Sequence, residues 1–139
     1  MSCPDTFCAP RTGAHASLLL LFLAAGAASF LLRSRVASGG AEVLDASGTL
    51  CWAGALTIVV SLALRCSRWW RPWTWVIALA LSLGVEFLQA TPYPAAWQAA
   101  FPPTHLVFGS TFSWGDVPWY VVGVGLAWWL LGRRRAPAR

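Results

Sequence analysis

The stretch WVIALALSLGVEFLQA, residues 75–90, combines a long apolar run with two polar side chains near its end. The run is typical of a helix dissolved in lipid, yet it carries Glu86 and, three residues later, Gln89. Positions i and i+3 lie on one face of a helix, so the carboxyl and the carboxamide point to the same side. An ionisable side chain in such a helix is costly and normally faces the interior of a bundle. The stretch therefore predicts a membrane helix whose polar face is buried against other helices.

The composition of the whole chain also indicates a membrane protein. Of its 139 residues, 58% are hydrophobic and only 11% are charged, whereas about 25% are charged in ordinary soluble domains. Ten residues are tryptophan, a side chain that collects where hydrocarbon meets lipid headgroups. The net charge of +5 comes from arginines that lie between the apolar runs, whereas a nucleic-acid-binding protein gathers basic residues in a patch or stripe. We expect the lipid bilayer as a partner and no nucleic acid.

Four apolar runs predict an all-α membrane protein, a bundle of four transmembrane helices. Each run has roughly 15–18 residues, fewer than the about 20 that span a hydrocarbon core, so flanking arginine and tryptophan side chains must extend it. A long loop, residues 91–115, contains four prolines, and we expect it to cover the outer mouth of the bundle with a short helix near residues 95–100. The predicted parts are a cytoplasmic tail at 1–15, a transmembrane domain at 16–132 with helices at 16–32, 49–64, 73–90 and 117–131, and a basic tail at 133–139.

The distribution of arginine predicts the orientation. With four helices, both tails and the second connection share one side, and eight of the ten arginines lie there. The positive-inside rule then places both termini in the cytoplasm, and we expect a cytoplasmic (inner) membrane. Small residues at 24–29 would also suit a cleaved signal peptide, but the continuation of the run to Leu32 favours a retained helix. The tryptophans then fall at two boundaries: Trp69, Trp70, Trp73, Trp75, Trp128 and Trp129 at the inner one, and Trp52, Trp97, Trp114 and Trp119 at the outer one.

Glu86 requires a partner or neutralisation, and Asp116, at the start of the fourth helix, is the predicted neighbour. Tyr120 follows Asp116 by four residues and shares its helical face. If two carboxyls approach each other, one pKa must rise, and they can share a proton. Arg33 or Arg35, at the outer end of the first helix, could instead hold one carboxylate charged. The predicted polar cluster consists of Glu86, Gln89, Asp116 and Tyr120.

Structural roles offer an alternative explanation for the same residues. Asp116 could cap the fourth helix, because an acid suits the positive end of a helix dipole. Glu86 could form a hydrogen bond that clamps the third and fourth helices. His105 is the only base of neutral range near the outer mouth, but no nucleophile stands out beside it, so we assign no catalytic residue. The spacing of Glu86, Gln89, His105 and Asp116 is irregular, and we expect neither a metal nor a cofactor.

Two stretches, VEFLQATPYPAAW at residues 85–97 and LVFGSTFSWGDVPWYVVGVGLA at residues 106–127, resemble the bacterial membrane family known as domain of unknown function 2809. A third, GTLCWAG at residues 48–54, resembles the family's start of the second helix, with Thr49 where an aspartate is usual. A looser similarity to VanZ-like proteins rests on a Glu-x-x-Gln followed by a later Asp. The resemblance implies a polytopic membrane protein and lends no activity. The motif residues that match are Glu86, Gln89, Gly109, Phe112, Asp116, Tyr120 and Gly123.

We expect the outer-facing cluster to bind a small polar molecule or a lipid headgroup rather than to carry out catalysis. One alternative is a proton-coupled transporter of a small solute, with Glu86 and Asp116 as a relay. Four short helices make a narrow bundle, so a transporter would need a homo-oligomer. Another alternative is an envelope hydrolase or transferase that uses His105 and an acid on a lipid-linked substrate.

Overall fold

The computed structural model describes residues 12–33, 35–36, 38–64, 71–101, 104 and 113–133, and the secondary-structure elements within them are all helical. The predicted all-α class is therefore confirmed for these residues. Gly109 and Phe112 of the family motifs lie outside them, and so does His105. The α-helices are α1 (Thr12–Arg33), α2 (Ser38–Ala63), α3 (Thr74–Gln89), α4 (Tyr93–Ala100) and α6 (Val117–Arg133), with 3₁₀ turns η1 (Arg71–Trp73) and η3 (Trp114–Asp116).

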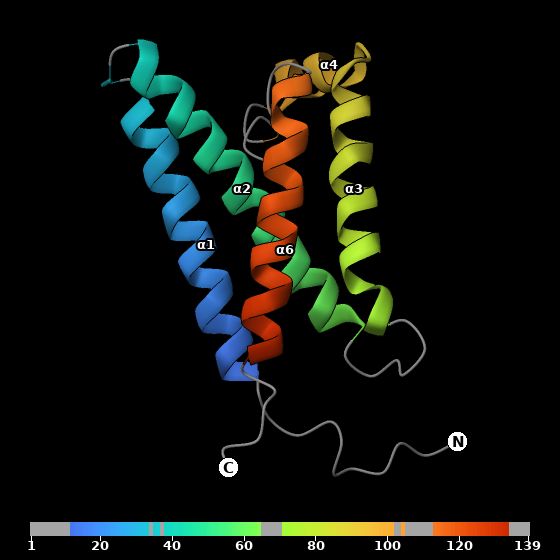
Figure 1. Ribbon diagram of the computed structural model, residues 1–139. Coiled ribbons are helices and arrows are strands. Elements are labelled where there is room, and N and C mark those ends of the chain that lie inside the picture. Colours follow the sequence, from blue (N-terminus) through green and yellow to red (C-terminus); the bar gives the residue numbers. More distant parts are fainter. Residues whose placement is uncertain are drawn as a thin grey trace, which may run out of the picture.

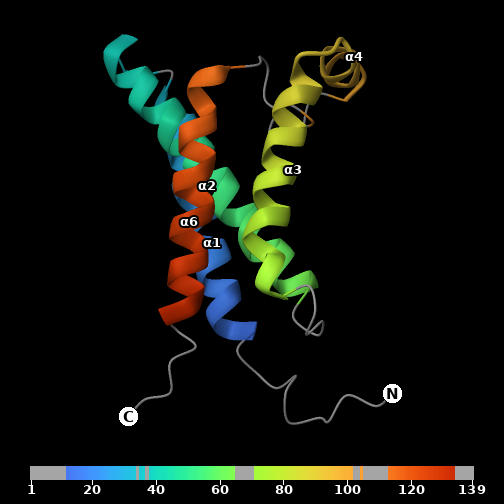
Figure 2. The same ribbon diagram turned by 45° about the vertical axis from the view of Figure 1, so that its right-hand side comes forward.

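Helix α2 is the centre of the bundle. Helices α1, α3 and α6 each pack against it, and α3 and α6 also contact each other. Figure 1 shows that α2 crosses the bundle diagonally from the upper end of α1 to the lower end of α3, and Figure 2 shows α3 beside α6, with α4 at the upper end of α3. The first residue of α1 and the last of α6 lie at one end of the bundle, called here the Thr12 end; α4 lies at the opposite end, called the α4 end.

Two hydrophobic clusters hold these helices together, and both include α2 and α6. The first adds α1 and consists of Leu18, Phe22, Cys51, Ala55, Ile58, Ala127 and Leu131. The second adds α3 and consists of Ala53, Val60, Ala78, Tyr120 and Val124.

The buried face of α3 explains how Glu86 enters the interior. Four residues at a spacing of four form this face: Thr74, Ala78, Ser82 and Glu86. The first three are small, so α3 can approach its neighbours closely, which favours helix association in lipid. The Ser82 hydroxyl donates a hydrogen bond to the carbonyl of Ala78 at 2.9 Å, so its polarity is satisfied within the helix. Glu86 takes its partners from other segments of the chain.

Close backbone contact fixes the crossing of α2 and α6. A Cβ atom added to Gly123 of α6 would lie 2.3 Å from the carbonyl oxygen of Leu50 on α2. A side chain at this position would force the two backbones apart, so glycine sets the distance between these helices.

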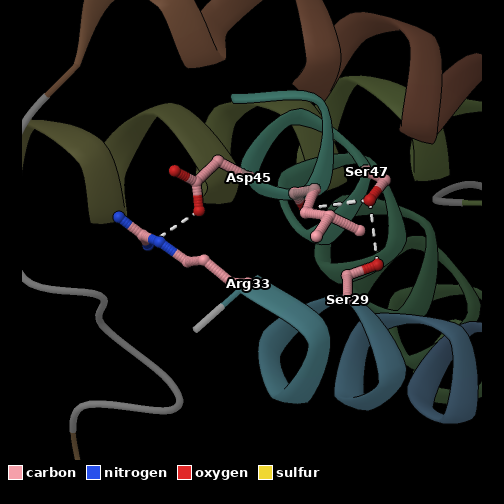
Figure 3. Close-up of polar contacts among 5 residues, drawn as sticks. Ser29, Arg33, Asp45 and Ser47 are labelled. Carbon is pink, nitrogen blue, oxygen red and sulfur yellow. Dashed lines mark hydrogen bonds and ion pairs between the residues drawn. The ribbon is translucent and has the colours of Figure 1, made fainter. Parts of the chain in front are cut away.

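Helix α2 is longer than the hydropathy pattern predicts. It begins at Ser38 rather than near Thr49, because its first turns are polar and give no apolar signal. These polar turns pack beside the last turns of α1, where Arg33 and Asp45 form an ion pair at 2.7 Å (Figure 3). In the same figure the hydroxyls of Ser29 and Ser47 lie 2.8 Å apart. The predicted boundary was wrong because polar contacts between helices stabilise this part of α2.

The extension of α2 changes the position of Trp52. Its indole was expected at the end of a helix, but Trp52 lies well inside α2. Its ring packs edge-on against Tyr120, with the centroids 6.1 Å apart. Trp52 therefore belongs to the interior packing of the bundle.

The helices are apolar enough to indicate a membrane protein. By length and hydropathy, Gly13–Arg33 and Gly40–Ala63 each qualify as a membrane span. Helices α3 and α4 would qualify together as a third, but the chain bends by 83° between them. The predicted short helix in the long loop corresponds to α4, which begins directly after Pro92.

Candidate functional site

Glu86 lies in the interior of the bundle, and only 1% of its surface is exposed. One carboxylate oxygen, Oε2, accepts a hydrogen bond from the Tyr120 hydroxyl at 2.5 Å. The other, Oε1, accepts a hydrogen bond from the backbone N–H of Ser113, also at 2.5 Å. The two oxygens of the carboxyl group therefore have separate partners on different segments. Glu86 therefore joins α3 to the start of α6 and to the segment just before it.

The local backbone around Ser113 explains why its N–H group is free to make this bond. Ser113 has an extended conformation and precedes the 3₁₀ turn η3. Its carbonyl accepts a hydrogen bond from the backbone N–H of Asp116 at 3.0 Å. The first N–H groups of a helical turn have no partner within the turn. The Glu86 carboxylate supplies a partner for the residue at that boundary.

Tyr120 is held from two sides. Its hydroxyl donates to Glu86 on α3, and its ring contacts Trp52 on α2. The residue is buried, with 5% of its surface exposed. Because a buried phenol needs a hydrogen-bond partner, this arrangement fixes both the ring and the hydroxyl of Tyr120.

Asp116 lies just before α6, in η3, and is partly buried. Its carboxyl has a side-chain hydrogen bond with the Thr49 hydroxyl on α2. Burial, followed by the negative charge of Glu86, raises the pKa of Asp116, while the bond from Thr49 opposes this rise and the charge of Asp45 adds to it. The structure thus brings Glu86 and Asp116 close enough to influence each other.

Thr49 lies where the sequence resemblance implies an aspartate. A threonine hydroxyl can donate a hydrogen bond to a carboxylate, whereas an ionised aspartate can only accept. In this chain Thr49 therefore supports the Asp116 carboxylate rather than repelling it.

A cavity of about 1050 Å³ lies at the α4 end, next to these residues. Its walls come from α1, α2, the end of α3, the residues around η3 and the first turn of α6. Gln89, Asp116 and Tyr120 line the cavity, but Glu86 is not among the lining residues. Ser113 and Tyr120, the two partners of Glu86, do line it. Glu86 therefore orients part of the cavity wall from behind, while Asp116 and Gln89 are within reach of a bound molecule.

The arginines have a different position from the one that the sequence suggests. Arg33 pairs with Asp45 on α2 rather than with Glu86 or Asp116. Both side chains remain substantially exposed, with 56% and 40% of their side-chain surface accessible. Arg35 is exposed and is not among the residues that line the cavity. The longer α2 explains this pairing, because its polar first turns lie beside the end of α1.

Sequence reasoning missed the contribution of α2 to this site. Glu42, Asp45, Thr49 and Trp52 all line the cavity, and their spacing of three, four and three residues repeats one helical face. That periodicity was a usable signal, hidden because Glu42 and Asp45 precede the apolar run. Within the described parts of the chain, no group of three or more His, Cys, Asp or Glu side chains has the arrangement of a metal site.

Comparison with known proteins supports the resemblance seen in the sequence. Residues 41–124, more than half of the chain, match the family described as Protein of unknown function (DUF2809). The matched region contains most of α2 and all of α3, α4 and η3, and it includes Asp45, Thr49, Glu86, Asp116 and Tyr120. Searches of curated proteins and of solved structures gave no match. The chain belongs to the DUF2809 family, and the residues that hold α3, α6 and α2 together around Glu86 all lie within the matched region.

Proposed function

We propose that this protein crosses the bacterial cytoplasmic membrane four times, through α1, α2, α3 and α6, and binds a small polar molecule or a lipid headgroup at its polar cluster. The cluster is Glu86, Gln89, Asp116 and Tyr120. The binding proposal rests mainly on Asp116, a partly buried carboxyl that lines a cavity and lies near a second, fully buried carboxyl.

The outer surface of the helices supports four spans. Large apolar side chains are exposed on each of the four long helices, where lipid tails would cover them. Helices α3 and α6, with 16 and 17 residues, are about 24–26 Å long, a little short of a hydrocarbon core of about 30 Å. Tryptophan and arginine at their ends would extend them, and the Arg133 guanidinium lies 3.8 Å from the centroid of the Trp129 ring. Examples of the exposed side chains are Leu20, Leu21, Leu31, Val43, Val59, Leu81, Phe87, Val121 and Val122.

The ends of the helices support cytoplasmic termini. The start of α1 and the end of α6 lie at the same end of the bundle (Figure 1), as an even number of crossings requires. Most arginines of the sequence flank that end, which the positive-inside rule assigns to the cytoplasm. The polar cluster and the cavity would then face the outer side of the membrane.

The cost of burying carboxyls supports a binding role. An acidic residue at the centre of a membrane helix costs about 2.5–3.5 kcal/mol on insertion scales, and such residues mark functional sites in many membrane proteins. The hydrogen bonds from Tyr120 and Ser113 satisfy Glu86, so its role is to position the cavity wall. Asp116 and Gln89 line that wall and can contact a ligand directly.

The proposal is tested by identifying what the purified protein retains. The full chain, extracted in a neutral detergent, is analysed by native mass spectrometry for bound small molecules and lipids. We expect a bound species of one-to-one stoichiometry whose occupancy falls at least about fivefold, or about 1 kcal/mol, in the variants Asp116→Asn and Gln89→Ala. Gly125→Ala is the matched control, because a Cβ there would meet nothing within 4 Å. Equal occupancy in all four proteins would contradict a binding role for the cluster.

The transport and enzyme alternatives have less support. The bend between α3 and α4 lies after Gln89, at the α4 end, whereas broken helices in transporters carry their sites near the middle of the membrane. The hydrolase alternative relies on His105, which lies outside the described residues. A homo-oligomer remains a proposal linked to the transport alternative.

A further inference from the structure

The cavity at the α4 end is long and has a polar end and an apolar end. Along α1 its lining runs from Phe22 to Arg33, a length of about 16 Å at about 1.5 Å per residue. Along α2, which is antiparallel to α1, it runs from Ala55 back to Glu42. The charged lining residues, Arg33, Glu42, Asp45 and Asp116, all lie at the α4 end, and the lining nearest the Thr12 end is apolar.

The two helices that flank the cavity separate toward the α4 end. Near the Thr12 end, α1 and α6 share a hydrophobic cluster through Leu18, Phe22, Ala127 and Leu131. Toward the α4 end their ribbons diverge (Figure 1), and the cavity lining there includes both α1 and the first turn of α6. The Phe22 ring, packed over Gly54 of α2, lies at the deep end.

The charge at the polar end is negative. Among the described residues, the lining contains one basic side chain, Arg33, and three acidic ones, Glu42, Asp45 and Asp116. Arg33 is already paired with Asp45 at 2.7 Å. The remaining negative charge disfavours an anionic headgroup and favours a cationic one.

Aromatic rings border the same region. Trp52, Trp119 and Tyr120 line the cavity together with Asp116. The faces of tryptophan and tyrosine attract ammonium groups, and aromatic residues combined with acids are a recurring means of binding quaternary ammonium ligands. These aromatic rings are evidence separate from the carboxylates, and they also indicate a headgroup that contains an ammonium group.

The deeper lining suits a hydrocarbon chain. Phe22, Leu23 and Ala27 of α1 and Cys51 and Ala55 of α2 are all apolar or weakly polar and line this part of the cavity. A hydrocarbon chain can pack against these side chains as lipid tails and helices pack in a bilayer, through van der Waals contact.

We propose that the cavity binds a membrane amphiphile whose head carries an ammonium group, with the head beside Asp116 and the rings of Trp52 and Trp119, and one hydrocarbon chain lying over α2 between α1 and α6. This inference rests on the proposed headgroup site and assigns it a ligand class. An entire lipid, rather than a free amine, is the expected ligand because the apolar part of the cavity is continuous with the polar part.

Three dioleoyl lipids with different heads test the inference. The full chain in neutral detergent is mixed with one lipid at a time: a trimethylammonium-propane lipid, phosphatidylethanolamine or phosphatidylglycerol. Native mass spectrometry measures the one-to-one complex. We expect retention to decrease in that order, with at least about a tenfold difference between the first and the last, or about 1.4 kcal/mol. Free choline at millimolar concentration should not displace the trimethylammonium lipid.

Variants locate the head and the chain. Asp116→Asn should reduce the difference between the three lipids at least about threefold, or about 0.65 kcal/mol, and Gly125→Ala should leave it unchanged. Ala27→Trp, which fills the apolar part of the cavity, should lower the retention of all three lipids and preserve their order. Thermal unfolding of each variant shows whether the fold is intact.

The possible failures can be distinguished. If phosphatidylglycerol is retained as well as the cationic lipid while Asp116→Asn and Gln89→Ala still lower retention, the ammonium inference is wrong and the headgroup site stands. If neither variant changes the retention of any lipid, the proposed function itself is wrong. If free choline displaces the trimethylammonium lipid, the hydrocarbon chain contributes nothing to binding. That result would overturn the proposal that the ligand is an amphiphile.

Discussion

The Tyr120 hydroxyl donates a hydrogen bond to the Glu86 carboxylate at 2.5 Å, and this bond joins α6 to α3 in the interior of the bundle. Both residues are at least 95% buried, since 5% of Tyr120 and 1% of Glu86 is exposed. A hydrogen bond to a charged group in such surroundings is worth about 1.5–3 kcal/mol. This bond adds to the hydrophobic cluster that α3 and α6 share, and the effect of removing the carboxylate should be measurable.

We predict that Glu86→Ala lowers the free energy of unfolding by about 3 kcal/mol or more, because the Tyr120 hydroxyl and the Ser113 N–H lose their acceptor. Glu86→Gln should cost less, because its carbonyl oxygen can still accept one of these bonds. Chemical denaturation in detergent measures both. A double-mutant cycle with Tyr120→Phe should give a coupling energy of about 1.5–3 kcal/mol. A coupling energy near zero would contradict the bond.

We predict that Gly123→Ala destabilises the protein by about 1–3 kcal/mol, the usual cost of overpacking. Its Cβ would lie 2.3 Å from the backbone oxygen of Leu50, so α2 and α6 would have to separate. Gly125→Ala, two residues further along α6, is the control and should be close to wild type, because its Cβ would meet nothing within 4 Å. Thermal unfolding in the same detergent compares the two. Equal melting temperatures would mean that the α2–α6 contact is looser than described.

The pKa of Asp116 predicts a dependence of stability on pH. A carboxyl whose pKa is raised in the folded state binds its proton more tightly when folded, so stability is highest at low pH and falls as the pH rises from the unfolded value of 3.8 through the raised folded value. Burial is the main cause of the rise, followed by repulsion from Glu86. Asp116→Asn should reduce this loss of stability. The melting temperature of the variant minus that of wild type should therefore be more positive at pH 8 than at pH 3.5.

Thr49→Val provides a second test of the same carboxyl. The valine side chain has nearly the shape of threonine but removes the hydroxyl that opposes the rise in the pKa of Asp116. The pH range in which stability falls should therefore shift upward in this variant. Melting temperatures between pH 3.5 and 8 measure the shift. An unchanged profile would show that Thr49 does not act on Asp116.

We predict that the ion pair between Arg33 and Asp45 contributes little. Both side chains are substantially exposed, and exposed pairs are typically worth about 0–1 kcal/mol. A double-mutant cycle with Arg33→Gln and Asp45→Asn should give a coupling energy in that range, which declines as salt is added. A coupling energy as large as that of Glu86 and Tyr120 would indicate that lipid or protein excludes water from this pair.

The sequence by itself determined the helical class, the family and the polar face of α3. The ends of α3 and α6 follow their apolar runs closely, because hydropathy is a local property of a segment. Glu86 was identifiable as a costly residue that needs partners, and Tyr120 was identifiable from its spacing to Asp116. The family motifs around these residues were also present in the sequence, and the match over residues 41–124 confirms that resemblance.

Only the tertiary structure decided which groups meet. The polar start of α2 becomes helical beside α1, so Arg33 pairs with Asp45 and Thr49 reaches Asp116. The crossing of α2 and α6, set by Gly123 against Leu50, brings Trp52 to Tyr120 and leaves the cavity between α1 and α6. Hydropathy and periodicity describe one segment at a time, whereas a polar side chain selects its partner by the angle and distance at which whole helices pack. That geometry depends on contacts between residues far apart in the chain.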